Sequence, residues 1–249
     1  MTFIDVHCHI EMCKGKPEEI VKRAKKAGVS IMINQGVNTR ANRKCLELAS
    51  KLNEIKPALG IYPLDALKLD DEKLDEELDF IRKNREKIVA LGEIGLDFKE
   101  DLTNRERQKE IFQKIINLSF ELDIPLIVHS RKAEKECIEM LEKAGAKKVV
   151  MHCFSGNFGL VKKIIENGWF FSIPASIKFS EHFQKLVKEC PISQLFCETD
   201  SPYLHPDKER DNEPMNVAES YKKIAEIKGI SLNECEKTIE ENYKRLFLK

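Results

Sequence analysis

The sequence predicts one α/β domain, a (β/α)8 TIM barrel that spans residues 1–249. Eight short apolar runs alternate with longer amphipathic, charged stretches, which indicates parallel strands with helical crossovers, and eight strands close a barrel. The length of 249 residues fits one barrel and is too short for two ordinary enzyme domains. An open doubly wound sheet is the alternative, but no Gly-rich phosphate fingerprint follows the first run.

The expected strands are the short apolar runs themselves. In chain order they cover residues 3–8, 30–34, 57–61, 88–92, 125–129, 148–153, 169–173 and 195–199. We find no internal repeat, no linker and no low-complexity tract that would divide the chain.

The expected helices fill the stretches between and after these runs. They cover Pro17 to Ala27, Ala41 to Leu52, Asp71 to Asn84, Thr103 to Leu122, Ala133 to Ala144, Gly159 to Asn167, Ser180 to Glu189, Val217 to Lys228 and Leu232 to Leu246. Pro17 stands near a helix start, and glycines 28, 145, 168 and 229 follow helix ends, as is usual for these residue types. Ser180 and Asn104 are predicted to cap helix starts. The irregular segment 202–214 is predicted to be a long loop over the top of the barrel.

Charge and cysteine content restrict the class of protein. Lys+Arg and Asp+Glu both number 42, so a strongly basic nucleic-acid clamp is not expected. A nucleic-acid substrate stays open, because bound divalent cations would supply positive charge locally. The eight cysteines form no CxxC pair, which predicts reduced intracellular thiols. With no secretory signal and no apolar run of about 20 residues, we expect a cytoplasmic protein without membrane contact, and no obligate protein partner is evident.

Six potential metal ligands stand at the ends of expected strands. They are His7, His9, Glu93, His129, His152 and Asp200. The C-terminal ends of barrel strands converge on one face, so these side chains can surround one cavity. Side chains alternate along a strand, so His7 and His9 face the same way and Cys8 faces the other way.

This ligand set predicts a metal centre. Mixed nitrogen and oxygen donors suit zinc, manganese, cobalt, nickel or iron and tolerate magnesium. Six ligands are too many for one open catalytic ion and suit two divalent cations with one bridging carboxylate. A pair of cations about 3.5–4 Å apart can activate water and stabilise the leaving oxygen of a phosphoester.

At these positions the chain resembles the TatD-type metal-dependent deoxyribonucleases of the amidohydrolase superfamily, over essentially its full length. The motifs that carry the resemblance are Asp5-Val-His-Cys-His9, Gly92-Glu-Ile-Gly-Leu-Asp97, Val128-His-Ser-Arg131, His152-Cys-Phe-Ser-Gly156, Glu198-Thr-Asp-Ser-Pro-Tyr-Leu204, Asn212-Glu-Pro214 and Asn242 to Phe247.

The resemblance implies a (β/α)8 barrel and a set of roles. His7, His9, Glu93 and Asp200 would hold one cation, and Glu93, His129 and His152 would hold the second. Glu93 and Asp200 would be catalytic, with Asp200 accepting a proton from the attacking water. The implied activity is hydrolysis of phosphodiester bonds, as a 3′-to-5′ exonuclease on single-stranded DNA or RNA.

The chain departs from the family pattern after the third expected strand. Where the family usually reads Gly-x-His-Pro-His, this sequence has Tyr62 and Leu64 in place of the two histidines. Tyrosine can hydrogen-bond to a phosphate oxygen but is a poor general base near neutral pH. A smaller departure is Lys132, where an acidic residue commonly follows the His-x-Arg motif.

Five residues are predicted to contact substrate: Arg131, Ser155, Tyr62, Arg210 and Asn212. A guanidinium can fork onto phosphate, and backbone N–H groups near Ser155 suit an anion.

Other residues near the expected site receive supporting or structural roles. Asp5, Asp97 and Glu198 are expected to orient the imidazoles. Tyr203 is expected to pack rather than stack on a base, His182 to lie on the surface, and Cys153 to point away from the cavity.

Two other functions stay open. One is a metal-dependent hydrolase of a small ester or amide, or of an aminoacyl-tRNA ester, on the same site. Many such relatives use a carbamylated lysine, and no expected strand ends in lysine here, which favours the nuclease. The other is a non-catalytic metal-stabilised scaffold or nucleic-acid-binding protein, which the intact ligand set disfavours.

Overall fold

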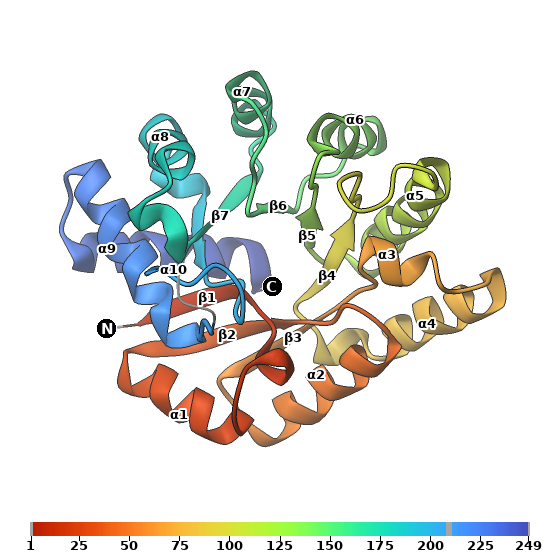
Figure 1. The fold of residues 1–249 in the computed structure, drawn as a ribbon, viewed down its shortest axis with the longest axis horizontal. Coiled ribbons are helices and arrows are strands. Elements are labelled where there is room, and N and C mark those ends of the chain that lie inside the picture. Colours follow the sequence, from red (N-terminus) through yellow and green to blue (C-terminus); the bar gives the residue numbers. More distant parts are fainter. Residues whose placement is uncertain (1, 208–210, 249) are drawn as a thin grey trace.

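The computed structural model describes residues 2–207 and 211–248, and in them eight parallel strands form a nearly closed barrel (Figure 1). The strands follow one another in chain order: β1 (Phe3–Cys8), β2 (Val29–Gln35), β3 (Ile55–Leu59), β4 (Ala90–Gly95), β5 (Leu126–His129), β6 (Val149–His152), β7 (Phe170–Pro174) and β8 (Leu195–Glu198). Each neighbouring pair is parallel. The predicted TIM barrel is confirmed.

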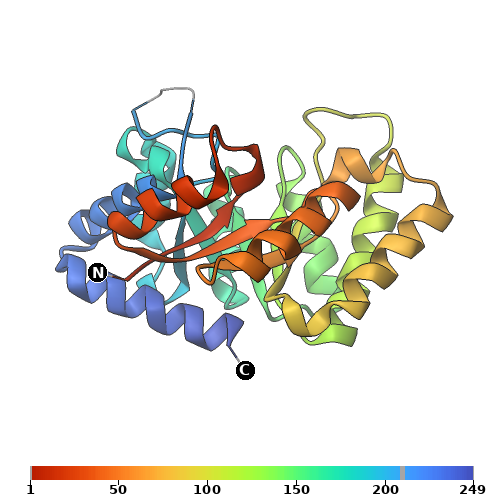
Figure 2. The same ribbon diagram turned by 90° about the horizontal axis from the view of Figure 1, so that it is seen from below.

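Helices cover the outside of the strands (Figure 1). They are α1 (Pro17–Lys26), α2 (Thr39–Lys51), α3 (Pro63–Ala66), α4 (Asp71–Lys83), α5 (Arg105–Leu122), α6 (Glu134–Ala144), α7 (Phe158–Glu166), α8 (Glu181–Glu189), α9 (Val217–Lys228) and α10 (Leu232–Phe247). Figure 2 shows α10 across one end of the barrel and the long loops at the other end. The predicted helices are all present within a few residues of their expected bounds, and the short α3 was not predicted.

The predicted helix punctuation is largely confirmed. Glycines 28, 145, 168 and 229 all take a positive φ. The Ser180 hydroxyl accepts a hydrogen bond from the backbone N–H of Phe183 and caps α8. The capping prediction for Asn104 is wrong, because its side chain makes no cap hydrogen bond. Asp101 instead accepts hydrogen bonds from the backbone N–H groups of Thr103 and Asn104 and organises the turn before α5.

The barrel is joined between its first and last strands just beyond their C-terminal ends. The backbone N–H of His9 donates to the Ser201 carbonyl at 2.8 Å, and the N–H of Asp200 donates to the His7 carbonyl at 2.9 Å. These two bonds bring the ends of β1 and β8 together. They therefore fix three of the predicted metal ligands relative to one another.

Two glycines allow β3, β4 and β5 to approach closely. A Cβ on Gly60 would lie 2.6 Å from the Gly92 carbonyl carbon and 2.7 Å from the Glu93 carbonyl oxygen. Gly95 has a φ of +136°, and a Cβ there would lie 2.0 Å from the His129 carbonyl oxygen. Only glycine fits such positions. The close backbone contacts at Gly60 and Gly95 therefore help to position Glu93 and His129.

The core between the strands and the helices is apolar, and the strands β1, β4, β6, β7 and β8 are buried along their whole length. All eight cysteines are free thiols, as predicted. In the described part of the chain, no helix has the length and apolar character needed to cross a membrane.

Candidate metal centre

The barrel brings the six predicted ligands together at the C-terminal ends of its strands. His7 lies on β1 and His9 follows it; Glu93, His129 and His152 lie on β4, β5 and β6; Asp200 follows β8. His7, His9, Glu93 and His152 are buried, whereas His129 and Asp200 are partly exposed. Polar side chains in such positions need partners, because burial without them is costly.

Glu93 stands at the middle of this group, with a separate pair of imidazoles beside each of its carboxylate oxygens. Oε1 lies 3.0 Å from Nδ1 of His129 and 3.5 Å from Nε2 of His152. Oε2 lies 3.5 Å from Nε2 of His7 and 3.3 Å from Nε2 of His9. The carboxylate thus faces two donor pairs on its two sides.

Asp200 completes the side that contains the β1 histidines. Its Oδ1 lies 3.5 Å from Nε2 of His7 and 3.6 Å from Nε2 of His9, and these two nitrogens are 3.3 Å apart. Two ligands about 2.1 Å from one tetrahedral cation are separated by roughly 3.4 Å. The spacing therefore fits donors that share a cation.

Two trios of ligand atoms lie within 4.8 Å of one another: His7, His9 and Asp200 form one, and His7, Glu93 and His152 form the other. The donor set of imidazole nitrogens and carboxylate oxygens, without thiolates, suits divalent transition metals and tolerates harder cations. The residues present fit the metal site that the sequence predicts.

Opposite charges shape the electrostatics of the centre. Burial disfavours the ionised carboxylate of Glu93, but hydrogen bonds from the four surrounding imidazoles hold its pKa well below the usual range. Burial likewise opposes charge on His9, but hydrogen bonds to Asp200 and Glu93 raise its pKa to about 10. The site therefore favours negative carboxylates facing positive charge, which a bound cation can supply.

Two buried carboxylates fix the outer nitrogens of two ligands. Glu198 Oε2 lies 3.2 Å from Nδ1 of His152, and Asp97 Oδ2 lies 2.9 Å from Nε2 of His129. Such contacts hold the ring orientation and tautomer of a metal ligand. The hydrogen-bond partners of Asp5 differ from those expected. It accepts hydrogen bonds from Thr199 and from the backbone N–H of His7, and no hydrogen bond from it to an imidazole is seen among the described residues.

A cavity of about 710 Å³ opens above this centre. It is lined by His9, Met12, Val37, Tyr62, Asp65, Glu93, His129, Ser130, Arg131, His152, Cys153, Ser155, Phe183, Asp200, Tyr203 and Leu204. Its size is in the range of small-molecule and cofactor sites. Three of the predicted substrate contacts, Tyr62, Arg131 and Ser155, therefore border the space next to the ligands.

Of the other two predicted substrate contacts, Asn212 is not among the residues that line the cavity. Asn212 is buried, and its amide donates to the carbonyl oxygens of Thr199 and Tyr203 while accepting from Asn216 and from the N–H of Glu213. Its side chain is used within the loop and does not face a substrate. Arg210 lies outside the described residues.

Two supporting predictions are corrected by the geometry, and a third stays a prediction. Tyr203 is 56% exposed and borders the cavity, and its packing role at the barrel mouth is the one that stays a prediction. Cys153 also lines the cavity, because a positive φ of 43° ends the strand alternation there. His182 is partly buried, with its Nε2 3.0 Å from the Phe154 carbonyl oxygen.

Sequence reasoning missed several residues that support the site. The Ser172 hydroxyl contacts Glu198, the Thr199 hydroxyl donates to Asp5, and Gln108 brackets the Asp97 backbone with two hydrogen bonds. Thr199 stands between two predicted functional residues, which is a usable signal. Gln108 sits in an ordinary amphipathic helix, and nothing in the sequence marks it.

The fold and its ligand set define a metal-dependent barrel hydrolase, and comparison with known proteins agrees. The family model of TatD related DNases matches residues 4–248, so the chain belongs to this family. It is 34% identical to the human protein named deoxyribonuclease TATDN3, covering 99% of this chain and 94% of that protein.

Two further relatives agree with this membership. The chain is 37% identical to an uncharacterised metal-dependent hydrolase of Methanocaldococcus jannaschii, covering 99% of this chain and 97% of that one. The crystal structure of the TatD homologue YjjV from Escherichia coli superimposes with a TM-score of 0.92 at 26% identity, over 98% of this chain and 97% of that one. The protein is thus an enzyme of the metal-dependent hydrolase class.

Proposed function

We propose that this enzyme is a divalent-metal-dependent phosphodiesterase that removes nucleotides from the 3′ ends of single-stranded DNA or RNA with the help of two cations. The observation that carries the proposal is the position of Glu93, whose two oxygens face separate pairs of imidazoles at 3.0–3.5 Å. A carboxylate with donors on both sides is suited to bridge two ions. The deoxyribonuclease named among the relatives supports a nucleic-acid substrate.

The two cations would divide the ligands between them. His7, His9 and Asp200 with Oε2 of Glu93 would hold one, and His129 and His152 with Oε1 of Glu93 would hold the other. When bound, such ions lower the pKa of water and stabilise the leaving oxygen of a phosphodiester. Magnesium, manganese, zinc, nickel, cobalt and iron all accept this donor set.

Asp200 is assigned as the proton acceptor. Its side chain is 16% exposed and borders the cavity, whereas that of Glu93 is 7% exposed. A carboxylate at the cavity wall can accept a proton from water while its other oxygen faces His7 and His9. Glu93 is assigned to hold the two halves of the centre together and keep their spacing.

The part of the cavity wall that contains Arg131 and Ser155 is assigned to bind the phosphate backbone of the substrate. The Arg131 guanidinium is half exposed and pairs with exposed Glu100 at 3.1 Å. An exposed pair of this kind is weak, so the guanidinium can exchange its partner for a phosphate. Ser155 is exposed and lines the same cavity. A net charge of zero suits an enzyme that holds the end of a strand through a few contacts.

The proposal is tested by digestion of end-labelled single-stranded DNA and RNA with Mg²⁺ or Mn²⁺. Wild-type protein should shorten the strand from its 3′ end, and EDTA should stop it. Asp200→Asn should abolish turnover, whereas Asp211→Asn, which changes an exposed carboxylate of the same loop, should cleave normally.

A different pattern of results would change the assignment. Equal cleavage by Asp200→Asn and wild type would remove Asp200 from its role. No cleavage by a metal-loaded protein would reject the nuclease and favour the alternative, a hydrolase of small esters, amides or aminoacyl-tRNA esters on the same site.

A further inference from the structure

One side of the cavity is formed by apolar side chains that are exposed to solvent. Met12 is 41% exposed, Tyr203 56% and Leu204 38%, and all three border the cavity. They are three of the eight large hydrophobic residues that are exposed in the described part of the chain. Together with Val37 we call these residues the apolar wall. Exposed apolar groups gathered in one place commonly mark a binding surface.

The apolar wall belongs to one side of the barrel. Met12 follows β1, Val37 follows β2, and Tyr203 and Leu204 follow β8. β1 pairs with β2 and also packs beside β8, so these loops are neighbours. The residues of the apolar wall therefore come from the ends of three adjacent strands.

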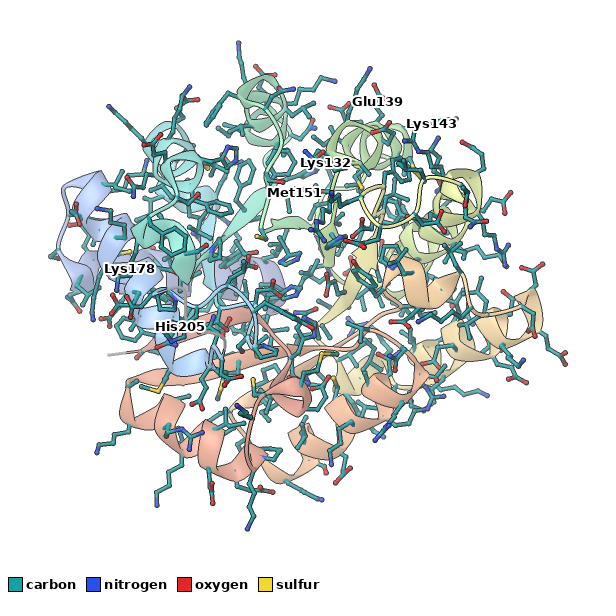
Figure 3. All side chains as sticks on the ribbon, in the orientation of Figure 1. Lys132, Glu139, Lys143, Met151, Lys178 and His205 are labelled. Carbon is teal, nitrogen blue, oxygen red and sulfur yellow. The ribbon has the colours of Figure 1, made fainter. Side chains whose placement is uncertain are left out.

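The opposite side of the cavity is polar. Ser130 and Arg131 after β5 and Ser155 after β6 border the cavity there, together with Cys153. In an eight-stranded barrel, β5 lies across the axis from β1. In Figure 3, Lys132, which follows Arg131, and His205, which follows Leu204, lie on opposite sides of the barrel. The metal ligands lie between the apolar and the polar side.

The backbone holds Tyr203 at the cavity. Its N–H donates to the Asp200 carbonyl at 2.8 Å, and its carbonyl accepts from the buried Asn212 amide at 2.6 Å. Leu204 has a φ of 55°, a left-handed conformation that is uncommon for a leucine. Backbone contacts thus link the position of Tyr203 to Asp200.

We propose that the apolar wall binds the terminal nucleobase of the substrate, with Tyr203 as the stacking surface. This inference rests on the proposed function. A strand end placed with its scissile phosphate at the metal centre carries a base with flat, apolar faces on one side and anionic backbone on the other. In the cavity, the apolar wall and Arg131 lie on opposite sides of the metal ligands. The apolar wall would therefore face the base, and Arg131 would face the backbone.

Stacking on Tyr203 would make the enzyme select nucleotides as substrates without a preference for any base. Every base has a π-face, so an aromatic ring accepts all four, and such contacts are sequence-tolerant. The cavity volume of about 710 Å³ admits the end of a strand. The apolar wall therefore selects for nucleotides against phosphodiesters that lack a base.

The test compares two single-stranded oligonucleotides that differ only at the 3′ end, one with a normal terminal base and one with an abasic terminal residue. Wild-type protein should cleave the first with a kcat/KM about 5- to 150-fold higher, the range expected for loss of one stacked base. In Tyr203→Ser, kcat/KM for the base-bearing strand should fall, so the preference over the abasic strand should disappear. Tyr203→Phe and the control Phe120→Ser, an exposed aromatic on the outer helix α5, should keep it.

The apolar wall is rejected as a base site if wild type cleaves both strands equally well, or if Tyr203→Ser slows both by the same factor. If neither strand is cleaved, the proposed nuclease function fails, and binding decides the inference separately. Quenching of a 3′-terminal 2-aminopurine by wild type but not by Tyr203→Ser would support base stacking. Equal quenching by both proteins would overturn it.

Discussion

The hydroxyl of Tyr62 donates a hydrogen bond to Oδ2 of Asp97 at 2.7 Å. The same carboxylate oxygen lies 2.9 Å from Nε2 of His129, whose Nδ1 lies 3.0 Å from Glu93. Burial and the hydrogen bond to Asp97 raise the pKa of Tyr62 well above its usual value, so the hydroxyl keeps its proton. Tyr62 therefore connects to the metal centre through Asp97.

Tyr62 is also fixed from behind. Its N–H donates to the Val37 carbonyl at 2.8 Å. The buried side chain of Asn42 holds Gly60, two residues earlier in the chain. The Gly60 N–H donates to Asn42 Oδ1 at 3.1 Å, and the Gly60 carbonyl accepts from Asn42 Nδ2 at 2.9 Å. The phenol that replaces the family's usual histidine is thus a positioned donor, and its proton is already used on Asp97.

This arrangement predicts a graded effect on metal affinity at the His129 side. Asp97→Asn should weaken binding by about 10- to 100-fold, the usual range for the partner of a ligand imidazole. Tyr62→Phe acts one contact further out and should weaken it less, by up to about tenfold. Equilibrium dialysis with Mn²⁺ measures both, and Tyr243→Phe on α10 is the matched control. Wild-type affinity in both site variants would contradict the connection.

Glu198 should have a similar role for His152. Its Oε2 lies 3.2 Å from the imidazole Nδ1, and its Oε1 accepts from the Cys153 N–H at 3.0 Å. Glu198→Gln keeps the shape but removes the charge that orients the ring, so metal affinity should fall by about 10- to 100-fold. Glu236→Gln changes another buried glutamate, one that accepts from the Thr2 N–H far from the site, and should bind metal normally. An equal loss in both variants would indicate general destabilisation.

Metal should stabilise the folded protein, because the ligands converge only in the barrel. At a free metal concentration of 100 times Kd, the gain in unfolding free energy is about 2.7 kcal/mol. For a chain of this size that corresponds to a rise in Tm of roughly 5–10 °C. Calorimetry with Mn²⁺ and with EDTA measures the shift. Glu93→Gln should lose most of it, exposed Glu100→Gln should keep it, and an identical Tm with and without metal would refute the prediction.

Arg131 should contribute one phosphate contact. Replacing it by Gln should weaken binding of single-stranded DNA and reduce the slope of log affinity against log salt by about 0.7. Arg107→Gln is the control, because Arg107 pairs with Asp71 on the outer surface. Fluorescence anisotropy over a range of salt concentrations gives the slopes. An unchanged slope for Arg131→Gln would place the guanidinium outside the interface.

The sequence was sufficient for the barrel and for the placement of the ligands. Alternation of apolar runs and amphipathic stretches identifies strands and helices, and the barrel geometry then places every strand end on one face. The sequence alone therefore predicts that residues at those ends, such as Glu93 and His152, are neighbours. Their roles as ligands, and the cytoplasmic location of the protein, stay predictions.

Loops and side-chain partners were harder to predict, because they depend on local backbone geometry. The positive φ of Cys153 reverses the direction expected from strand alternation. Asn212 was predicted to contact substrate, but its amide is saturated within its loop. Tyr62 lacks a free proton only because the β3 and β4 loops bring it beside Asp97. No periodicity in the sequence encodes these contacts.

The most direct test of the central claim, a metal centre bridged by Glu93, is the metal content of Mn²⁺-loaded protein measured together with its EPR spectrum. We expect two ions per chain with a spin-coupled signal, and loss of that coupling in Glu93→Gln. A single ion per chain, or two ions that give uncoupled signals in the wild type, would contradict the bridged centre.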